Sequence, residues 1–365
     1  MVEIEPQTIA TNVFDSMSSM EHEQLVYCYD KPTGLKALIA IHNTVLGPGM
    51  GGTRMWNYDT EEEAVRDVLR LSRGMTFKNA IAGLNIGGGK AVIIGDARKI
   101  KNEAFMRRFG RFVHSVGGKY WTAEDVNMST LDMEYVRMET PYVAGLPSHM
   151  GGSGDPSPVT AYGVYMGMKA AAQKVYGNDS LAGKKVVVQG AGHVGTELVG
   201  YLTKEDAKVS ISDIFEDKIK ACVKAHQVSV TDPNDVYDSD MDIYAPCALG
   251  ATLNDETIPK LKCAIVAGGA NNQLDEEKRH AQLLKEQGIL YAPDFLINSG
   301  GITNVYYEQQ GNYSKARVMS QTERIYDVCL QVIDYAENNL TTTHEAALDL
   351  ALKRIEAIGQ VKLSF

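Results

Sequence analysis

The stretch KKVVVQGAGHVGTELVGYL, residues 184–202, decides the fold of the second half of this chain. It joins a short run of β-branched residues to a glycine loop, GAGHVG, and then to a segment of helical character. The loop fits G-x-G-x-x-G, and its place between an expected strand and an expected helix distinguishes it from a chance match. The stretch therefore predicts a βαβ unit that binds a dinucleotide.

Each glycine of this loop has its own task. Gly190 permits the tight turn, Gly192 lets backbone amides approach a pyrophosphate, and Gly195 lets the helix pack closely on the strand. The helix N-terminus adds partial positive charge. The expected cofactor-binding loop is Gly190, Ala191, Gly192, His193, Val194 and Gly195.

An acidic residue ends the next expected strand. Asp213 follows AKVSIS and lies 23 positions after Gly190. A carboxylate there accepts hydrogen bonds from the ribose hydroxyls of adenosine and repels a 2′-phosphate. We therefore expect NAD rather than NADP. The alternative is a glycine-rich turn without a ligand.

Outward from this stretch, short apolar runs alternate with longer helical patterns, which is typical of an α/β protein with a mostly parallel sheet. In the second half, a long helix is expected to end near Lys174, and four strands follow in a doubly wound order. In the first half, the sequence predicts strands over residues 35–41 and 90–96. Thr60 and Glu63 predict a capping box ahead of a helix, and 103–116 predicts another.

The segment PSHMGGSGDPSP, residues 147–158, marks the boundary between two domains, because its Pro, Gly and Ser residues cannot continue a helix or a strand. We expect one domain over 1–150 and a dinucleotide-binding domain over 151–335. A C-terminal helical segment is expected over 336–365, within a stretch from 313 to 358 that reads as two helices.

Length and composition set wider limits. At 365 residues with 44% hydrophobic and 22% charged residues, the chain exceeds what one core usually holds. A net charge of −10 disfavours nucleic acid and membrane partners. The five cysteines show no C-x-x-C spacing, which favours reduced thiols in the cytoplasm. The start, MVEIEPQT, does not resemble a signal peptide, and no apolar run could span a membrane.

Two lysines and a carboxylate are the candidate catalytic groups. Lys78 and Lys90 lie in weakly charged, glycine-rich surroundings, and Asp125 follows in TAEDV. A buried lysine loses its proton more readily and can act as a general base, and a nearby carboxylate can hold it and relay a proton. The alternative, surface lysines, stays open because spacing does not show that the three residues meet.

Competing motifs are incomplete. GLNIGGGKA lacks the first glycine and the final Ser or Thr of a P-loop, GGSGD is not G-x-S-x-G, and no histidine pair forms H-E-x-x-H. No metal and no serine nucleophile are expected.

Seven motifs in order resemble the glutamate, leucine, phenylalanine and valine dehydrogenases, most closely the leucine enzymes of that family. The matching strings are LGPGMGGTRMW (46–56), GMTFKNAIAGLNIGGGKAVI (74–93), YWTAEDV (120–126), PSPVTAYGVYMGMKAA (156–171), DIYAPCALGATLN (242–254), GGANNQL (268–274) and INSGGITNV (297–305).

The resemblance implies an NAD-dependent oxidative deamination of an L-amino acid in a cleft between the two domains. It implies that Lys78 binds the substrate carboxylate, Lys90 is the base that activates water, and Asp125 shuttles protons. Gly51 and Gly52 would line the substrate site. Further cofactor contacts would come from Thr160, Asn272 and Asn298, although loop capping is an ordinary alternative for the asparagines.

Substrate choice depends on a few positions. Met50 stands where glutamate dehydrogenases carry a lysine, so a buried side-chain carboxylate would lack a partner there. Met75, Ile302 and Val305 match pocket-lining positions of the leucine enzymes, although ordinary core is an alternative. The resemblance thus implies broad activity on leucine, isoleucine and valine, with phenylalanine as the nearest rival.

Three residues depart from the family pattern, and other interpretations stay open. His193 stands where Asn is common, and Asn127 stands where Gly is usual, yet Asn tolerates a left-handed backbone. Met50 stands where leucine is common and keeps the apolar character. A catalytically silent NAD-binding sensor is the alternative of a different class. The resemblance also implies a homo-oligomer built through the first domain, with the C-terminal helices folding back onto that domain and with the octamer common among the leucine enzymes.

Overall fold

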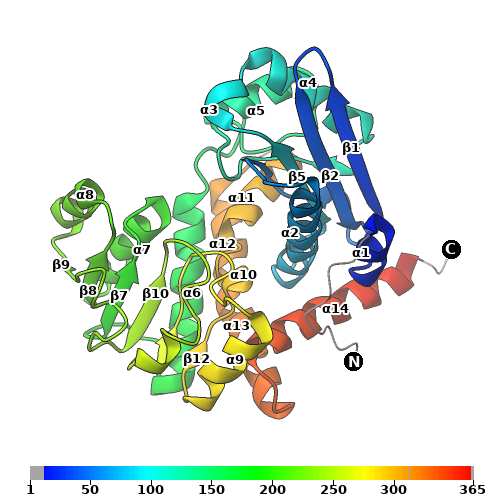
Figure 1. The fold of residues 1–365 in the computed structure, drawn as a ribbon. Coiled ribbons are helices and arrows are strands. Elements are labelled where there is room, and N and C mark those ends of the chain that lie inside the picture. The colour runs from blue at the N-terminus through cyan, green and yellow to red at the C-terminus, as the bar shows by residue number, and fades with distance from the viewer. Residues whose placement is uncertain (1–11, 312, 363–365) are drawn as a thin grey trace. The chain divides into compact units, whose positions relative to one another are not determined.

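The computed structural model describes residues 12–311 and 313–362. The chain forms two compact units (Figure 1). The first unit holds the chain up to Gly154, residues 308–311 and the part from Ile355 onward, and the second holds Asp155–Tyr307 and the stretch that ends at Arg354. The segment MVEIEPQT, for which no signal peptide is expected, and the end of the expected segment 336–365 lie outside the described residues.

A six-stranded sheet organises the first unit, in the order β1-β2-β5-β3-β6 with β4 also paired to β5. The sheet is mixed, because β1, β2 and β5 run antiparallel in turn while β3 and β4 run parallel to β5. The expected mostly parallel sheet is therefore wrong for this unit. The strands are β1 (Gln24–Asp30), β2 (Leu35–Asn43), β3 (Gly49–Met50), β4 (Thr53–Trp56), β5 (Gly87–Ile94) and β6 (Tyr120–Trp121); the helices are α1 (Val13–Ser19), α2 (Glu61–Ile81), α3 (Ala97–Ile100), α4 (Glu103–Ser115) and α5 (Thr130–Arg137).

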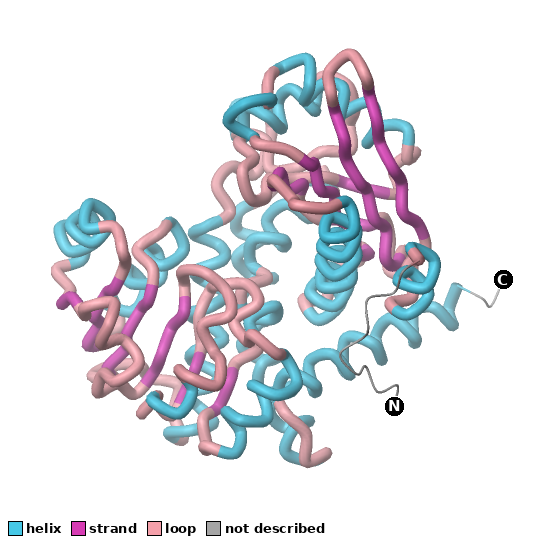
Figure 2. The backbone as a smooth tube through the Cα atoms, viewed as in Figure 1, coloured by secondary structure: helices cyan, strands magenta, loops and turns pink. Residues whose placement is uncertain are grey.

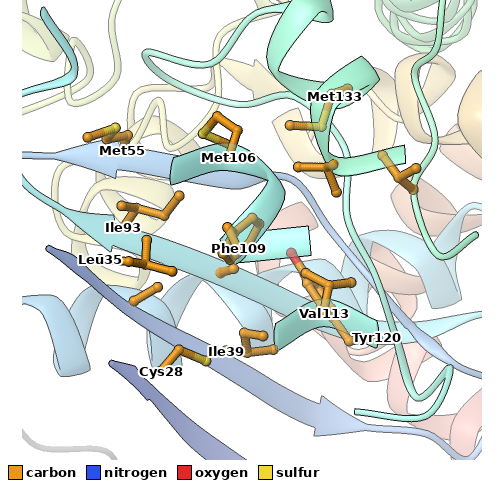
Figure 3. Packing of buried hydrophobic residues seen from close by; sticks show 14 of the residues in the cluster. Cys28, Leu35, Ile39, Met55, Ile93, Met106, Phe109, Val113, Tyr120 and Met133 are labelled. Carbon is orange, nitrogen blue, oxygen red and sulfur yellow. The ribbon is translucent and has the colours of Figure 1, made fainter. Parts of the chain in front are cut away.

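Strand β2 divides its side chains between two cores, because successive residues point to opposite faces of a sheet. Leu35 and Ile39 belong to a cluster that also holds Phe109 of α4 (Figure 3). Leu38 and Ala40 belong to a second cluster, with apolar side chains of α2. The sheet is therefore covered on both faces, and β2 and β5 are buried almost throughout.

Helix α2 begins after Thr60, whose Oγ1 accepts a hydrogen bond from the Glu63 amide at 3.2 Å. The Glu63 carboxylate accepts from the Asp59 amide at 3.2 Å. The expected reciprocal capping box is thus only half formed, because Glu63 reaches one residue further back than the motif requires.

The three consecutive glycines of β5 are needed for close packing. A Cβ on Gly87 would lie 1.9 Å from the Asn43 carbonyl oxygen, and one on Gly88 would lie 2.4 Å from the Thr76 backbone nitrogen. Strand β5 therefore approaches β2 on one side and α2 on the other more closely than any side chain allows. These close contacts explain why three glycines occur together here, although the segment lacks the other residues of a P-loop.

The second unit is built on a parallel six-stranded sheet in the order β12-β11-β10-β7-β8-β9, the doubly wound order expected (Figure 2). Its strands are β7 (Lys185–Gln189), β8 (Lys208–Ser212), β9 (Ser229–Val230), β10 (Ile243–Pro246), β11 (Ile265–Val266) and β12 (Leu290–Tyr291). The helices that follow the first unit are α6 (Ser157–Tyr176), α7 (His193–Lys204), α8 (Glu216–His226), α9 (Glu277–Glu286), α10 (Asp294–Ile297) and α11 (Gly300–Gln309).

The C-terminal stretch holds three helices where two were expected: α12 (Lys315–Glu323), α13 (Ile325–Asn338) and α14 (Thr343–Lys362). Arg324 alone separates α12 from α13. A break of one residue does not interrupt the apolar periodicity, so the sequence pattern does not reveal it.

Two histidines contact α2: the buried His42 of β2 and the half-buried His22, which precedes β1. His42 Nδ1 lies 2.8 Å from Thr76 Oγ1, and His22 Nε2 lies 2.9 Å from Ser72 Oγ. Their rings are 4.7 Å apart. Burial lowers the pKa of His22 to about 4, and burial together with the neighbouring His22 lowers the pKa of His42 to about 3. Both rings are therefore neutral at neutral pH.

This pair predicts a loss of stability in acid. In the unfolded chain, His22 and His42 bind protons near pH 6.5. In the folded chain their pKa values are about 4 for His22 and about 3 for His42, so stability falls as pH decreases from 6.5 toward these values. We expect the variant His42→Gln to be less stable at pH 7.5 but to lose less further stability between pH 6.5 and 4. Denaturant titrations across this range test the slope. His149→Gln, at an exposed histidine, serves as control, and equal slopes in all three proteins would contradict the prediction.

Candidate active site

Lys90 and Asp125 meet in the first unit. Lys90 is 5% exposed on β5, and its Nζ lies 2.9 Å from Asp125 Oδ2. Strand β4 fixes the segment that carries Asp125, because the Thr53 amide donates to the Ala123 carbonyl at 2.8 Å and the Met55 amide donates to Val126 at 3.0 Å. Since β4 also pairs with β5, both charged residues are held by one sheet.

A third charged residue, which the sequence motifs contain but do not single out, completes this group. Arg54 Nε lies 3.1 Å from Asp125 Oδ2, and Arg54 Nη1 lies 3.1 Å from Asp67 Oδ2. Burial alone would raise the pKa of Asp125, but the charges of Lys90 and Arg54 outweigh it and hold that pKa below its usual value. Asp125 is therefore an ionised carboxylate at neutral pH.

The paired glycines lie against this group. A Cβ on Gly51 would lie 2.0 Å from the Gly89 carbonyl oxygen and 3.0 Å from Met75 Cγ. A Cβ on Gly52 would lie 3.0 Å from Asp125 Cβ. The backbone at 51–52 thus passes directly beside the carboxylate and Met75, where any side chain would clash.

The remaining expected substrate residues of the first unit lie in two elements. Lys78 is half-buried in the last turn of α2, and Met50 is fully buried in β3. Asn79, the residue after Lys78, ties these elements together, because its Nδ2 donates to the Gly87 carbonyl at 2.6 Å and to the Met50 carbonyl at 3.4 Å. The motifs do not distinguish Asn79 from an ordinary helix residue.

Asn127 adopts the left-handed conformation expected of it, with φ of 60°. Its Nδ2 donates to the Met55 carbonyl at 3.0 Å, and Lys101 Nζ donates to its carbonyl at 2.9 Å. The departure from glycine is therefore tolerated by the backbone and adds a bond to β4.

The glycine loop of the second unit has the expected geometry. Gly190 has φ of 117°, and a Cβ on Gly195 would lie 1.9 Å from the Gly190 carbonyl oxygen. Nothing lies within 4 Å of a Cβ on Gly192, which is the N-cap of α7 and offers no side chain to its first amides. Ala191 donates its amide to Asp213 Oδ2 at 2.7 Å, so loop and carboxylate are joined.

The other loop residues differ in exposure. His193 is exposed, with its Nδ1 3.6 Å from Asp155 Oδ2. Val194 lies against the backbone at Gly269, where a Cβ would be 2.7 Å from Val194 Cγ1. His193 is thus an exposed residue at the start of α7, whereas Val194 packs inward.

The asparagines occupy different surroundings. Asn298 is buried, and its Nδ2 donates to Asn271 Oδ1 at 2.9 Å, while its Oδ1 has no hydrogen-bond partner. Asn272 is exposed and has φ of 51°. Thr160 Oγ1 donates to the Pro156 carbonyl at 3.0 Å.

Ile302 and Val305 are buried on α11 in the second unit. Each unit thus assembles its own group of expected site residues: Lys90, Asp125, Gly51, Gly52 and Met75 in the first, and the glycine loop with Asp213 in the second. The expectation that both groups serve one active site stays a prediction.

The residues present fit a nicotinamide dinucleotide. Open space at Gly192, uncapped amides at the start of α7 and a carboxylate joined to the loop are what a pyrophosphate and a ribose require. The buried, unpartnered Oδ1 of Asn298 is an acceptor that a carboxamide N–H can use.

The described part of the chain gives little support for a metal site or for a cysteine nucleophile. No group of three or more His, Cys, Asp or Glu side chains among residues 12–311 and 313–362 is arranged to hold a metal ion. All five cysteines are free thiols. Cys247 lies beside the glycine loop, but burial raises its pKa to about 11, so it is a protonated thiol at neutral pH. No helix in those same ranges combines the length and apolar composition of a membrane span.

A dinucleotide fold together with a buried lysine–carboxylate pair defines the class of nicotinamide-dependent dehydrogenases. Comparison with known proteins agrees. The family model described as Glu/Leu/Phe/Val dehydrogenase, dimerisation domain, matches residues 22–142, and that described as Glutamate/Leucine/Phenylalanine/Valine dehydrogenase matches residues 151–361.

Individual relatives cover nearly the whole chain. Leucine dehydrogenase of Thermoactinomyces intermedius is 52% identical over 353 residues, which are 97% of this chain and 96% of that protein. Phenylalanine dehydrogenase of Caldalkalibacillus thermarum is 44% identical over 98% of this chain and 97% of its own. The crystal structure of L-tryptophan dehydrogenase from Nostoc punctiforme superimposes with a TM-score of 0.84 at 42% identity, covering 95% of this chain and 99% of that one. The chain belongs to the Glu/Leu/Phe/Val dehydrogenase family, and it is an amino-acid dehydrogenase that uses a nicotinamide cofactor.

Proposed function

We propose that this enzyme catalyses the NAD-dependent, reversible oxidative deamination of branched-chain L-amino acids: leucine, and also isoleucine and valine. Amino acid, NAD⁺ and water give a 2-oxo acid, ammonium, NADH and a proton. The observation that carries the chemistry is the 2.9 Å ion pair between the buried Lys90 and Asp125, since a protein that only binds NAD needs no such pair. The leucine dehydrogenase relative at 52% identity supports the substrate class.

Each residue of the first unit has a proposed role. Lys78 holds the substrate carboxylate with its ammonium group and so orients Cα. Lys90, as general base, takes a proton from the water that attacks the substrate imine, and Asp125 exchanges protons with the substrate nitrogen. Because Lys90 Nζ and Asp125 Oδ2 are within hydrogen-bond distance, a proton can pass between them directly. The bound nicotinamide supplies the acceptor for the hydride from Cα.

The proposed substrate pocket is apolar, which disfavours glutamate. Met50 offers no partner for a side-chain carboxylate, and an uncompensated buried charge is costly. Branched aliphatic chains differ by a methylene or less, so broad activity follows. The proposed substrate residues are Lys78, Met50, Gly51, Gly52, Met75, Ile302 and Val305.

The absorbance of NADH at 340 nm tests the proposal directly. We expect NADH formation with leucine, isoleucine and valine, little with NADP in place of NAD, and none with glutamate. Faster turnover with phenylalanine than with leucine would reassign the substrate. No NADH from any amino acid, in protein that still binds NAD, would contradict the proposal and favour a silent NAD-binding sensor.

The choice of NAD over NADP is proposed to depend on Asp213. Its two oxygens already accept from the Ala191 and Phe215 amides, and each keeps a lone pair for a ribose hydroxyl. Asp213→Asn is expected to raise kcat/KM with NADP relative to NAD by about tenfold or more, because a factor of ten needs only ~1.4 kcal/mol of removed repulsion. Asp217→Asn, at an exposed aspartate on α8, serves as control. An unchanged ratio would contradict the role.

The proposed cofactor residues are Gly190, Ala191, Gly192, His193, Val194, Gly195, Asp213, Thr160, Asn272 and Asn298. We assign substrate binding and oligomerisation to residues 1–150 and NAD binding to 151–335, followed by a C-terminal helical segment over 336–365. A homo-oligomer, with an octamer as one form, is proposed because the matching family model is a dimerisation domain. Light scattering that returned only the 39.9 kDa of one chain would contradict it.

The free cysteines support a cytoplasmic location.

A further inference from the structure

Two cations share one oxygen of Asp125. Lys90 Nζ lies 2.9 Å from Oδ2, and Arg54 Nε lies 3.1 Å from the same atom. The side chains of Lys90, Arg54 and Asp125 are 7%, 23% and 24% exposed, so this group is largely shielded from water. A carboxylate in such surroundings depends on its cations to stay ionised.

Arg54 is itself held at its other end. Its Nη1 lies 3.1 Å from Asp67 Oδ2 on α2, and the Tyr58 hydroxyl donates to that same oxygen at 2.6 Å. The planar guanidinium therefore bridges β4 and α2, and its Nε is aimed at Asp125 by a bond that does not involve the substrate. Lysine at this position could not contact both carboxylates in the same fixed geometry.

The two cations differ in one property that matters for a base. A lysine acting as general base must be neutral during part of the cycle, and Asp125 then loses the charge of one partner. A guanidinium stays protonated at any working pH. We propose that Arg54 is a positioning residue that keeps Asp125 ionised and in place while Lys90 alternates between its protonated and neutral forms, an inference that rests on the proposed role of Lys90.

The other titratable groups near Asp125 do not compete with this role. Tyr58 follows β4, and Tyr120 lies on β6. Because burial raises the pKa of both hydroxyls, both side chains stay neutral. Asp67 acts on Asp125 through Arg54. The charge of the Asp125 carboxylate is thus balanced by Lys90 and Arg54. The low pKa of Asp125 has the direction that this balance requires.

The test is the pH profile of Arg54→Gln. Removing the fixed positive charge makes a proton harder to remove from the remaining Lys90–Asp125 pair, so we expect the rising limb of kcat to move to higher pH by about one unit. At the pH where the wild-type enzyme reaches half its maximum, kcat should fall about fivefold. KM for leucine and the affinity for NAD, measured by protein fluorescence, should change little, because Lys78 and the glycine loop are untouched.

Two further variants make the result decisive. Arg54→Lys restores charge without the two-sided contact, so its limb should return toward the wild-type position while kcat stays several-fold low. Arg107→Gln removes another arginine–carboxylate pair of the first unit, with Glu139, and should leave the profile unchanged. A loss of kcat in Arg54→Gln that is equal at every pH would overturn the proposal. Wild-type turnover in Arg54→Lys would also overturn it. If Arg54→Gln does not fold, the turnover of Arg54→Lys decides the question. Absence of turnover in the wild-type enzyme would instead contradict the proposed function.

Discussion

Replacing Lys90 with alanine is expected to reduce kcat by about 10³-fold, within the range typical of a lost general base. The proposed reaction needs a base within reach of water, and Lys90 is the buried lysine that contacts Asp125. Removing it also leaves Asp125 with Arg54 as its remaining cation. Steady-state NADH formation with leucine measures the loss, and fluorescence titration measures NAD affinity, which should stay within a factor of two or so of the wild-type value because the glycine loop is unchanged.

A matched control separates chemistry from stability. Lys169 forms a similarly shielded pair with Glu205 in the second unit, with 2.8 Å between Nζ and Oε1. Lys169→Ala should lower the melting temperature while leaving kcat nearly unchanged. If Lys90→Ala kept wild-type turnover, the assignment of the base would be wrong. If both variants lost the same fraction of activity, the loss would reflect folding.

Replacing Gly195 with alanine should strongly weaken NAD binding and destabilise the second unit. The added Cβ would lie 1.9 Å from the Gly190 carbonyl oxygen, so α7 and the loop must separate. Overpacking of this kind typically costs about 1–3 kcal/mol. We expect NAD affinity to fall by about 10²-fold, because the helix start and the loop amides no longer face one pyrophosphate position. Isothermal titration with NAD and a thermal melt measure the two effects.

Gly192→Ala is the matched variant. A Cβ on Gly192 meets nothing within 4 Å, and the residue has φ of −76°, so the fold should tolerate alanine. The methyl group would occupy the space into which a pyrophosphate fits. We expect weaker NAD binding with an unchanged melting temperature. Unchanged NAD affinity in both variants would place the cofactor elsewhere.

Local features of this protein follow from the sequence because their causes are local. Gly190 and Gly195 are identifiable because a tight turn and a close helix approach admit no other residue, and the structure confirms both contacts. Helices α2, α4 and α6 follow from apolar periodicity and end signals within one segment. The left-handed Asn127 is likewise a property of one residue.

Very short strands cannot be predicted from the sequence in this way. Strands β9 and β12 have two residues each, too few to show alternation, and their partners in the sheet define them. The mixed first sheet has the same origin, since strand direction depends on connections that apolar runs do not encode. The single-residue break at Arg324 changes no periodicity.

By itself, then, the sequence determined the α/β class, the doubly wound second half, the glycine loop with its acid, and the residue types that can move protons. Only the tertiary structure decided that Lys90 and Asp125, 35 positions apart in the sequence, share an ion pair and that Arg54 completes it from β4. The physical reason is that charge pairing depends on distance in space, which sheet registry sets, whereas turns and helices depend on the preferences of neighbouring residues.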